Sequence, residues 1–330
     1  MKFLVIQTAF TGDVILATAL LEKIHSSFPD AEITMLVRKG NETLLSNHPY
    51  LKEVLVWNKK ENKLNNLRKL ISVVRAKKFD YAINLQRFAG TGILTALSGA
   101  KEKLGYAKNP MSIFYNRRLP HTIGDGTHEI ERNQALIGHL VDQKISKSRL
   151  YPSQVDKNNI SKYTGKKYIT ISPGSVWFTK TFPAYKWIEL IQKYKSESPE
   201  TVIYLLGSKT EASLGDEIIA KSGHPKTVNL AGALSFLEST ALMFTSEMNY
   251  VNDSAPLHMA SAINAPVTAV YCSTVPRFGF GPLSDLSRIT ETDLNLNCRP
   301  CGLHGYKSCP MTHFKCAHSI DINNIYYSGK

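Results

Sequence analysis

The sequence predicts an α/β fold made of two doubly wound parallel sheets. In the first half, short apolar runs with strand character alternate with segments that have helical spacing of apolar residues. The same alternation starts again at Tyr168, after a polar and basic stretch over residues 146–167 that resembles an interdomain linker or a surface connection. The chain has 330 residues, which is enough for two domains of ordinary size. We therefore expect a first domain at residues 1–160 and a second at residues 161–330, and leave open whether the last helix packs back on the first domain.

The first half supplies its elements in a regular order. Residues 3–6 predict a buried strand, and apolar residues at helical spacing predict a helix over residues 14–27. Pro29 and Asp30 break the chain before a second strand at residues 33–37. A strand at residues 54–56, a basic amphipathic helix at residues 63–77 and a strand at residues 81–85 continue the series. This rhythm is typical of a parallel sheet with helical crossovers.

The second half predicts strands at residues 168–171, 202–206, 248–251 and 267–271. Its glycines do not support a dinucleotide oxidoreductase, and neither do those of the first half. The first turn has the single glycine Gly12, and the Gly90-Thr-Gly92 fragment lacks the third glycine of the dinucleotide fingerprint. A P-loop signature does not occur either.

Composition and charge narrow the class of protein. With 43% hydrophobic and 20% charged residues, the chain is expected to be globular, and its apolar runs are too short to cross a bilayer. The first apolar run stops at Gln7, which does not suit a signal peptide, so a cytoplasmic location is expected. The formal charge of +13 favours anionic partners. No nucleic-acid-binding signature is present, and a phosphorylated substrate at a membrane face suits this charge better than nucleic acid does.

Four of the five cysteines lie close together near the C-terminus. An odd cysteine count in a protein expected in the cytoplasm argues against a disulfide framework. Reduced thiols in a compact loop are the favoured interpretation. A zinc site is the alternative, although the spacing is irregular and a second CxxC pair is missing. Its ligands would be Cys298, Cys301, Cys309 and Cys316, with nearby histidines at positions 304, 313 and 318.

A carboxylate, Asp13, stands where the first strand turns into the first helix. It can cap the helix, because aspartate accepts hydrogen bonds from free N–H groups and suits the positive helix end. It can also do chemistry, because the carboxyl ends of strands face the ligand crevice in open α/β sheets.

Two loops of the second half carry further candidates. Lys180 follows a Pro-Gly turn and precedes Pro183, which suits a helix start, so a lysine and a helix N-terminus together offer a pyrophosphate site. Asp253 and Ser254 either cap the following helix or bind a phosphate or a sugar hydroxyl with its free N–H groups. His258, inside that helix, is interpreted as a packing or orienting residue.

The segments IQTAFTGDVILATALL, SPGSVWFTKTFP and NDSAPLHMASA occur in this order, each at a predicted strand. Together with LLGSKTE, Asn229-Leu-Ala-Gly232 and the CRPCG…CP cysteines, they resemble the family-nine glycosyltransferases, the lipopolysaccharide heptosyltransferases. The resemblance extends over most of the chain. It implies the GT-B architecture, in which two Rossmann-like α/β/α domains face each other across a cleft, with the acceptor on the first and the nucleotide sugar on the second.

The resemblance also implies an inverting enzyme that uses ADP-heptose and needs neither a metal ion nor a cofactor. Asp13 then becomes the general base, a role that one carboxylate within reach of the acceptor hydroxyl can fill. Lys180 contacts the donor phosphates with Thr179 nearby, because a lysine and a helix N-terminus can neutralise the leaving ADP. The resemblance further implies that Asp253 binds heptose hydroxyls, that Ser254 lies near the diphosphate and that Glu211 binds the nucleoside.

The implied acceptor is the lipid A-core at the inner face of the cytoplasmic membrane, where the enzyme would bind peripherally through its positive charge. Lys108, Arg117 and Arg118 are candidates for acceptor phosphate or carboxylate groups, or else a solvated basic face.

The chain also departs from the family pattern at Gln7-Thr8-Ala9, Thr181 and Ala255. These departures leave room for another nucleotide sugar or acceptor. A non-catalytic protein that binds zinc or nucleic acid is a further alternative, but it does not explain Asp13, Lys180 and Asp253.

Overall fold

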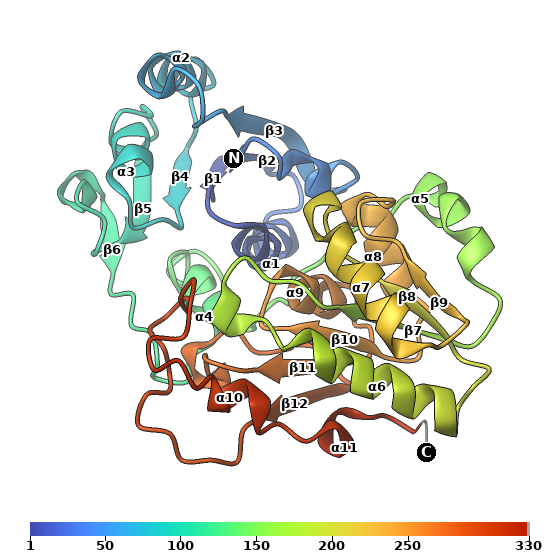
Figure 1. The fold of residues 1–330 in the computed structure, drawn as a ribbon. Coiled ribbons are helices and arrows are strands. Elements are labelled where there is room, and N and C mark those ends of the chain that lie inside the picture. Colours follow the sequence, from blue (N-terminus) through green and yellow to red (C-terminus); the bar gives the residue numbers. More distant parts are fainter. Residues whose placement is uncertain (329–330) are drawn as a thin grey trace. The chain divides into compact units, whose positions relative to one another are not determined.

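The computed structural model describes residues 1–328, apart from the side chain of Lys63, and divides the chain into two compact units (Figure 1). The first is Met1–Tyr151, and the second begins at Pro152. Each contains one six-stranded sheet in which every pair of neighbours is parallel. The predicted pair of Rossmann-like α/β units is therefore confirmed. The units divide after Tyr151, whereas the sequence suggested a division after residue 160.

The first sheet has the strand order β3-β2-β1-β4-β5-β6. Its winding reverses between β1 and β4, which makes the carboxyl ends of these two strands the switch point where such sheets bind ligands. Helices α1 and α4 contact each other, as do α2 and α3. The strands are β1 Lys2–Ile6, β2 Glu32–Arg38, β3 Leu51–Trp57, β4 Tyr81–Asn84, β5 Glu102–Tyr106 and β6 Arg117–Leu119, and the helices are α1 Thr11–Ser27, η1 Glu42–Leu45, α2 Lys63–Ala76, α3 Ala89–Ala96, η2 Ser112–Phe114 and α4 Glu129–Ala135.

The second sheet has the order β12-β11-β10-β7-β8-β9, so its switch point lies between β7 and β10. Helices α6 and α7 pack together, and α8 contacts α9 and α5 (Figure 1). The strands are β7 Tyr168–Ser172, β8 Val202–Leu205, β9 Thr227–Asn229, β10 Asn249–Asn252, β11 Val267–Tyr271 and β12 Ser287–Glu291. The helices are α5 Gln154–Asn159, η3 Ser161–Tyr163, η4 Phe178–Lys180, α6 Ala184–Glu197, η5 Lys209–Glu211, α7 Ala212–Ser222, α8 Phe236–Phe244, α9 Ala255–Ala262, η6 Pro276–Phe278, α10 Lys315–His318 and α11 Ile322–Ile325.

The central strands of both sheets are covered on both faces. Phe3, Leu4, Val5 and Ile6 are fully buried, as parallel sheets with helices on both sides require. In the second unit, the Trp187 ring packs edge-on against Phe182, with ring centroids 5.0 Å apart. Among residues 1–328, no helix combines the length and the apolar character needed to cross a bilayer.

The polar stretch over residues 146–167 contains the division between the two units, and it is ordered on both sides of that division. Its first part is bound to α1, because the Arg149 amide donates to Thr18 Oγ1 at 2.9 Å and the Tyr151 hydroxyl donates to Glu22 Oε1 at 2.7 Å. Its next part forms α5, which starts with a capping box between Ser153 and Asp156. Hydrogen bonds fix the stretch in place, and such bonds do not require apolar residues at regular spacing in the sequence.

The last helix, α11, packs within the core of the second unit. Ile322 and Ile325 are buried there together with residues of α6.

Candidate functional site

A cluster of polar side chains lies at the carboxyl ends of β7, β10 and β11, around the switch point of the second sheet. Lys180 belongs to the loop after β7, and Asp253 follows β10 directly. The Lys180 Nζ atom lies 2.7 Å from Asp253 Oδ2, and the two side chains are only 15% and 8% exposed. A buried ion pair loses much of its hydration, so it persists only where further hydrogen bonds support it.

Thr274, just past β11, supplies such a bond. Its hydroxyl donates to Asp253 Oδ2 at 2.6 Å, and the residue is 1% exposed. Both contacts therefore fall on the same carboxylate oxygen. Oδ1 carries neither of them.

Thr179 and Ser273 complete the arrangement. Both are fully buried, and the Ser273 hydroxyl donates to Thr179 Oγ1 at 3.0 Å. Because residues 179–180 and 273–274 are consecutive, the contacts close into a ring. We call this set the polar ring, and its members are Thr179, Lys180, Asp253, Ser273 and Thr274.

The C-terminal loop of residues 298–314 holds the polar ring from outside. The Tyr306 amide donates to Thr179 Oγ1 at 2.7 Å, and the Thr179 amide donates to the Tyr306 carbonyl at 3.1 Å. The Arg299 guanidinium donates to the carbonyls of Cys272 and Thr274, both at 2.8 Å. Gly305 has φ +76°, and a Cβ there would lie 2.7 Å from Thr179 Oγ1, so only glycine fits.

Asn252, the last residue of β10, fixes the loop that carries Lys180. Its Nδ2 donates to the carbonyls of Pro173 at 2.8 Å and Gly174 at 3.1 Å, and its Oδ1 accepts from the Phe182 amide at 2.9 Å. Inspection of the sequence missed Asn252, Ser273, Thr274 and Tyr306. Small polar residues directly after β11 were a usable signal for two of them, because β10 and β11 are neighbours in the sheet.

Glu211 lies beside the same loop, at the start of the helical segment after β8. Its Oε2 accepts from the Ser208 amide and hydroxyl, both at 2.7 Å. Its Oε1 approaches the backbone of Gly174 so closely that a Cβ there would be 1.6 Å away. The structure thus places Glu211 against the loop that carries Lys180.

Side-chain capping of α9, one of the two alternatives for Asp253 and Ser254, is not formed. Helix α9 starts at Ala255, and Ser254 occupies the N-cap position without a side-chain capping bond. The Asp253 carboxylate belongs to the polar ring instead. His258 is buried at 6% exposure, in agreement with a packing role.

Asp13 lies in the first unit, at the end of β1 and thus at the switch point of that sheet. The predicted N-cap position is wrong, because α1 begins at Thr11 and Asp13 is a half-buried residue of its first turn. A carboxylate there still interacts favourably with the helix dipole.

A cation approaches the same end of β1 from elsewhere in the sequence. Lys59 Nζ donates to Thr8 Oγ1 at 2.7 Å and to the Thr8 carbonyl at 3.2 Å. Lys59 thus places a positive charge beside Gln7-Thr8-Ala9, which itself has no basic residue.

The three acceptor candidates do not converge on one face. Lys108 is exposed in the turn after β5, while Arg117 and Arg118 are consecutive residues of β6. Successive side chains of a strand point to opposite faces, so the two arginines cannot act on the same side of the sheet.

The clustered cysteines line one cavity of about 220 Å³, whose wall also includes Thr179 and Ser273. Within residues 1–328, no group of three or more histidine, cysteine, aspartate or glutamate side chains is arranged to hold a metal ion. Burial raises the pKa of Cys316 to about 11 and also raises that of Cys301. All five cysteines are free thiols in the structure.

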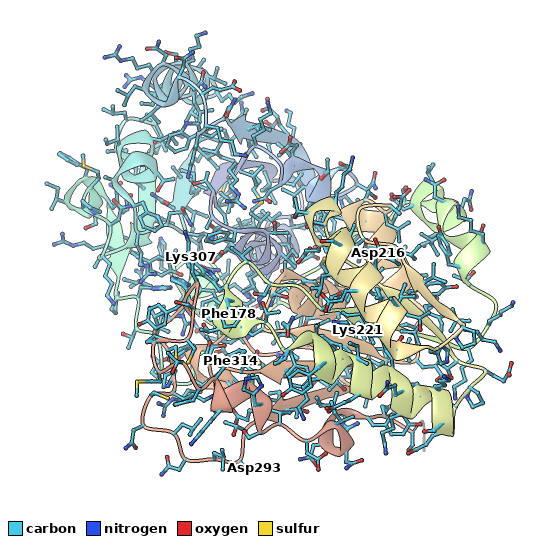
Figure 2. All side chains as sticks on the ribbon, viewed as in Figure 1. Phe178, Asp216, Lys221, Asp293, Lys307 and Phe314 are labelled. Atoms are coloured by element: carbon cyan, nitrogen blue, oxygen red, sulfur yellow. The ribbon has the colours of Figure 1, made fainter. Side chains whose placement is uncertain are left out.

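Aromatic rings cover the outside of this loop. Figure 2 shows Phe178 and Phe314 close together, and their ring centroids are 5.1 Å apart. The loop after β7 and the C-terminal loop are thereby joined by ring packing as well as by the Thr179–Tyr306 hydrogen bonds.

Comparison with known proteins identifies the family of the chain. Lipopolysaccharide heptosyltransferase 3 of Escherichia coli is 27% identical over 277 residues, which cover 80% of this chain and 82% of that protein. Lipopolysaccharide heptosyltransferase 1 of Campylobacter coli is 24% identical over 318 residues, covering 88% and 90%. The structure of the E. coli ADP-heptose lps heptosyltransferase II superposes with a TM-score of 0.78 at 23% identity, covering 96% of this chain and 98% of that one. The profile of glycosyltransferase family 9 (heptosyltransferase) matches residues 67–307, and the chain therefore belongs to this family of glycosyltransferases.

Proposed function

We propose that the protein is an inverting, metal-independent heptosyltransferase that moves heptose from ADP-heptose to the lipopolysaccharide inner core. The family and the names of the relatives support the reaction class and the sugar. The observation that carries the proposal is the Lys180–Asp253 pair at the switch point of the second sheet. A cation can bind the diphosphate of a sugar nucleotide, and a carboxylate beside it can accept hydrogen bonds from the hydroxyls of the adjoining sugar.

On the donor side, Lys180 neutralises the negative charge that grows on the leaving ADP. Such a fixed charge in a partly dry site stabilises the transition state more than the same charge in water. Asp253 accepts hydrogen bonds from heptose hydroxyls through Oδ1, because Oδ2 already has two partners. Thr179 positions the Lys180 backbone.

Two other residues extend the donor site. Ser254 lies at the start of α9, where helix N–H groups favour the diphosphate. Glu211 accepts hydrogen bonds from the nucleoside, and its contact with Gly174 sets the distance between nucleoside and diphosphate.

Asp13 acts as the general base on the acceptor side. It takes the proton of the acceptor hydroxyl while that oxygen forms a bond to the anomeric carbon, and the bond from this carbon to the ADP oxygen breaks with its electron pair leaving on ADP. A single displacement of this kind inverts the anomeric centre. Lys108, Arg117 and Arg118 bind anionic groups of the lipid A-core acceptor at the cytoplasmic membrane surface, with the two arginines acting on separate groups.

A related reaction with another nucleotide sugar or acceptor is the second candidate. It is favoured by Gln7-Thr8-Ala9, Thr181 and Ala255, which depart from the pattern of the family. A thermal-shift panel of ADP-, UDP- and GDP-sugars separates the two, since the proposed enzyme is stabilised by ADP-heptose above the others.

The test is ADP release from ADP-heptose with a deacylated lipopolysaccharide-core acceptor in the presence of a chelator. We expect acceptor-dependent release that survives chelation and falls by at least about 100-fold in Asp13→Asn. Asp30→Asn, an exposed carboxylate of the same unit, serves as the matched control and keeps wild-type activity. An Asp13→Asn enzyme as active as the control would return Asp13 to a structural role.

A further inference from the structure

Three of the most exposed apolar side chains of the first unit lie on the loops that follow β4 and β5. Phe88 is 66% exposed, Ile113 71% and Phe114 54%. Large apolar side chains in water are tolerated singly, but a group of them on neighbouring loops marks a contact surface. We call these three residues, with Lys108 and Arg118, the docking face.

The two loops are fixed to each other. Asn109 is 1% exposed, and its Nδ2 donates to the carbonyls of Gln86 at 2.9 Å and Phe88 at 3.1 Å. Its Oδ1 accepts from the Met111 amide at 2.9 Å, just before the η2 turn that carries Ile113 and Phe114. One buried side chain therefore holds both apolar segments, so their exposure is a feature of the folded unit.

Basic residues accompany the apolar ones. The Ala107 amide donates to the Leu119 carbonyl at 2.8 Å, so Lys108 and Arg118 are each one residue away from the same hydrogen bond. Both are exposed, and neither forms an ion pair within residues 1–328.

Acidic residues are nearly missing from this part of the chain. Residues 81–124 contain a single acid, Glu102, among six basic residues, which are Arg87, Lys101, Lys103, Lys108, Arg117 and Arg118. Glu102 begins β5, whereas Lys108 follows its other end, roughly 13 Å further along the strand. The docking face thus has an uncancelled positive charge around protruding apolar groups.

We propose that this face docks the protein on an anionic phospholipid bilayer. Phe88, Ile113 and Phe114 enter the boundary between headgroups and acyl chains, and Lys108 and Arg118 bind lipid phosphates. Apolar and aromatic groups flanked by cations are the combination that binds such an interface. This inference deepens the proposed function, because a lipid-linked acceptor lies in the same surface.

Two other exposed apolar side chains lack this combination. Val155 is 66% exposed but adjoins Asp156, and Phe244 is 58% exposed but lies three residues before Glu247. Substitution of Val155 and Phe244 therefore provides a control, because it removes exposed apolar area at positions that have an acidic residue nearby. Leu64, 71% exposed on the basic helix α2, is the rival site.

The experiment is co-sedimentation of the full chain with vesicles of phosphatidylglycerol and phosphatidylethanolamine, and with vesicles of phosphatidylcholine alone. We expect binding to the anionic vesicles that weakens with salt, because screening acts on the cationic contribution. The triple variant Phe88→Ser/Ile113→Ser/Phe114→Ser should lose at least about tenfold in partition coefficient. Val155→Ser/Phe244→Ser and Leu64→Ser should bind as the wild type does.

The proposal is overturned if the triple variant binds like the wild type, if Leu64→Ser alone abolishes binding, or if both kinds of vesicle bind equally. It is also overturned if the wild-type protein does not bind vesicles but forms a dimer, and the triple substitution dissociates that dimer. Thermal unfolding checks that the triple variant is folded. A failed transferase assay would leave the vesicle result unaffected, so the two proposals fail separately.

Discussion

Replacement of Thr274 by valine tests whether the polar ring positions the Asp253 carboxylate. Valine keeps the shape of the side chain but removes the hydroxyl that donates to Asp253 Oδ2 at 2.6 Å. A hydrogen bond to a charged group contributes about 1.5–3 kcal/mol. If the lost bond acts on the transition state, kcat/KM for the sugar nucleotide falls roughly 10- to 150-fold.

The expected fall in kcat/KM follows from which Asp253 carboxylate oxygen is left to bind the ligand. In the wild type, Lys180 and Thr274 both bind Oδ2, which leaves Oδ1 for a sugar hydroxyl. Without Thr274, only Lys180 holds the carboxylate, and the carboxylate can rotate so that either oxygen meets the lysine. The loss should therefore depend on the sugar, with a smaller effect on the binding of ADP alone.

The assay compares steady-state ADP release with the Kd of ADP for the wild type, Thr274→Val and Thr274→Ser. Serine keeps the hydroxyl and should restore most of the activity, which separates hydrogen bonding from packing. The reasoning is refuted if Thr274→Val stays within about twofold of the wild type while Asp253→Ala is inactive. It is equally refuted if ADP binding and kcat/KM fall together by the same factor.

Two further predictions concern stability. Gly305→Ala should destabilise the second unit by about 1–3 kcal/mol more than Gly126→Ala, because both have positive φ but only at Gly305 would a Cβ meet Thr179 Oγ1, at 2.7 Å. Thermal unfolding measures both, and equal shifts would mean that the C-terminal loop moves freely away from the polar ring. His48, 6% exposed, has its pKa lowered to about 4 by burial, from a usual value near 6.5, so the unfolded chain binds its proton first as the pH falls. Stability should therefore drop by about 3 kcal/mol between pH 6.5 and pH 4, and His48→Gln should flatten this part of the curve in urea unfolding, whereas an unchanged slope would assign the loss to other groups.

The sequence predicts the strands of the fold better than the contacts of its site. Apolar runs such as residues 3–6 and 267–271 form strands because a parallel sheet buries both faces, and this leaves a continuous apolar signature. The sequence does not predict how residues 146–167 are held, because their order comes from single hydrogen bonds, such as that from Arg149 to Thr18, which leave no periodic pattern.

Motif order brought Lys180 and Asp253 into consideration, but no pattern in the sequence shows that they touch. Their contact depends on β7 and β10 being neighbours, although 76 residues of chain lie between Ser172 and Asn249. Ser273 and Thr274 were missed because single hydroxyl side chains after a strand are common in loops. They indicate a site only once β11 is known to lie next to β10. The end of β11 was therefore predictable as a ligand-facing edge only after the strand order was known.

The C-terminal cysteine loop supports the polar ring without any metal-binding arrangement among the described residues. The Tyr306 amide donates to the Thr179 hydroxyl, the Thr179 amide donates to the Tyr306 carbonyl, and Arg299 donates to the carbonyl of Thr274, so the loop contacts both halves of the polar ring. Protonated thiols are small and weakly polar, and they suit a cavity wall that must pack closely behind a hydroxyl pair. Burial raises the pKa of Cys301 and Cys316 further above 7, so both thiols are neutral near that pH. The cavity wall that they share with Thr179 and Ser273 therefore carries no negative charge from these two thiols.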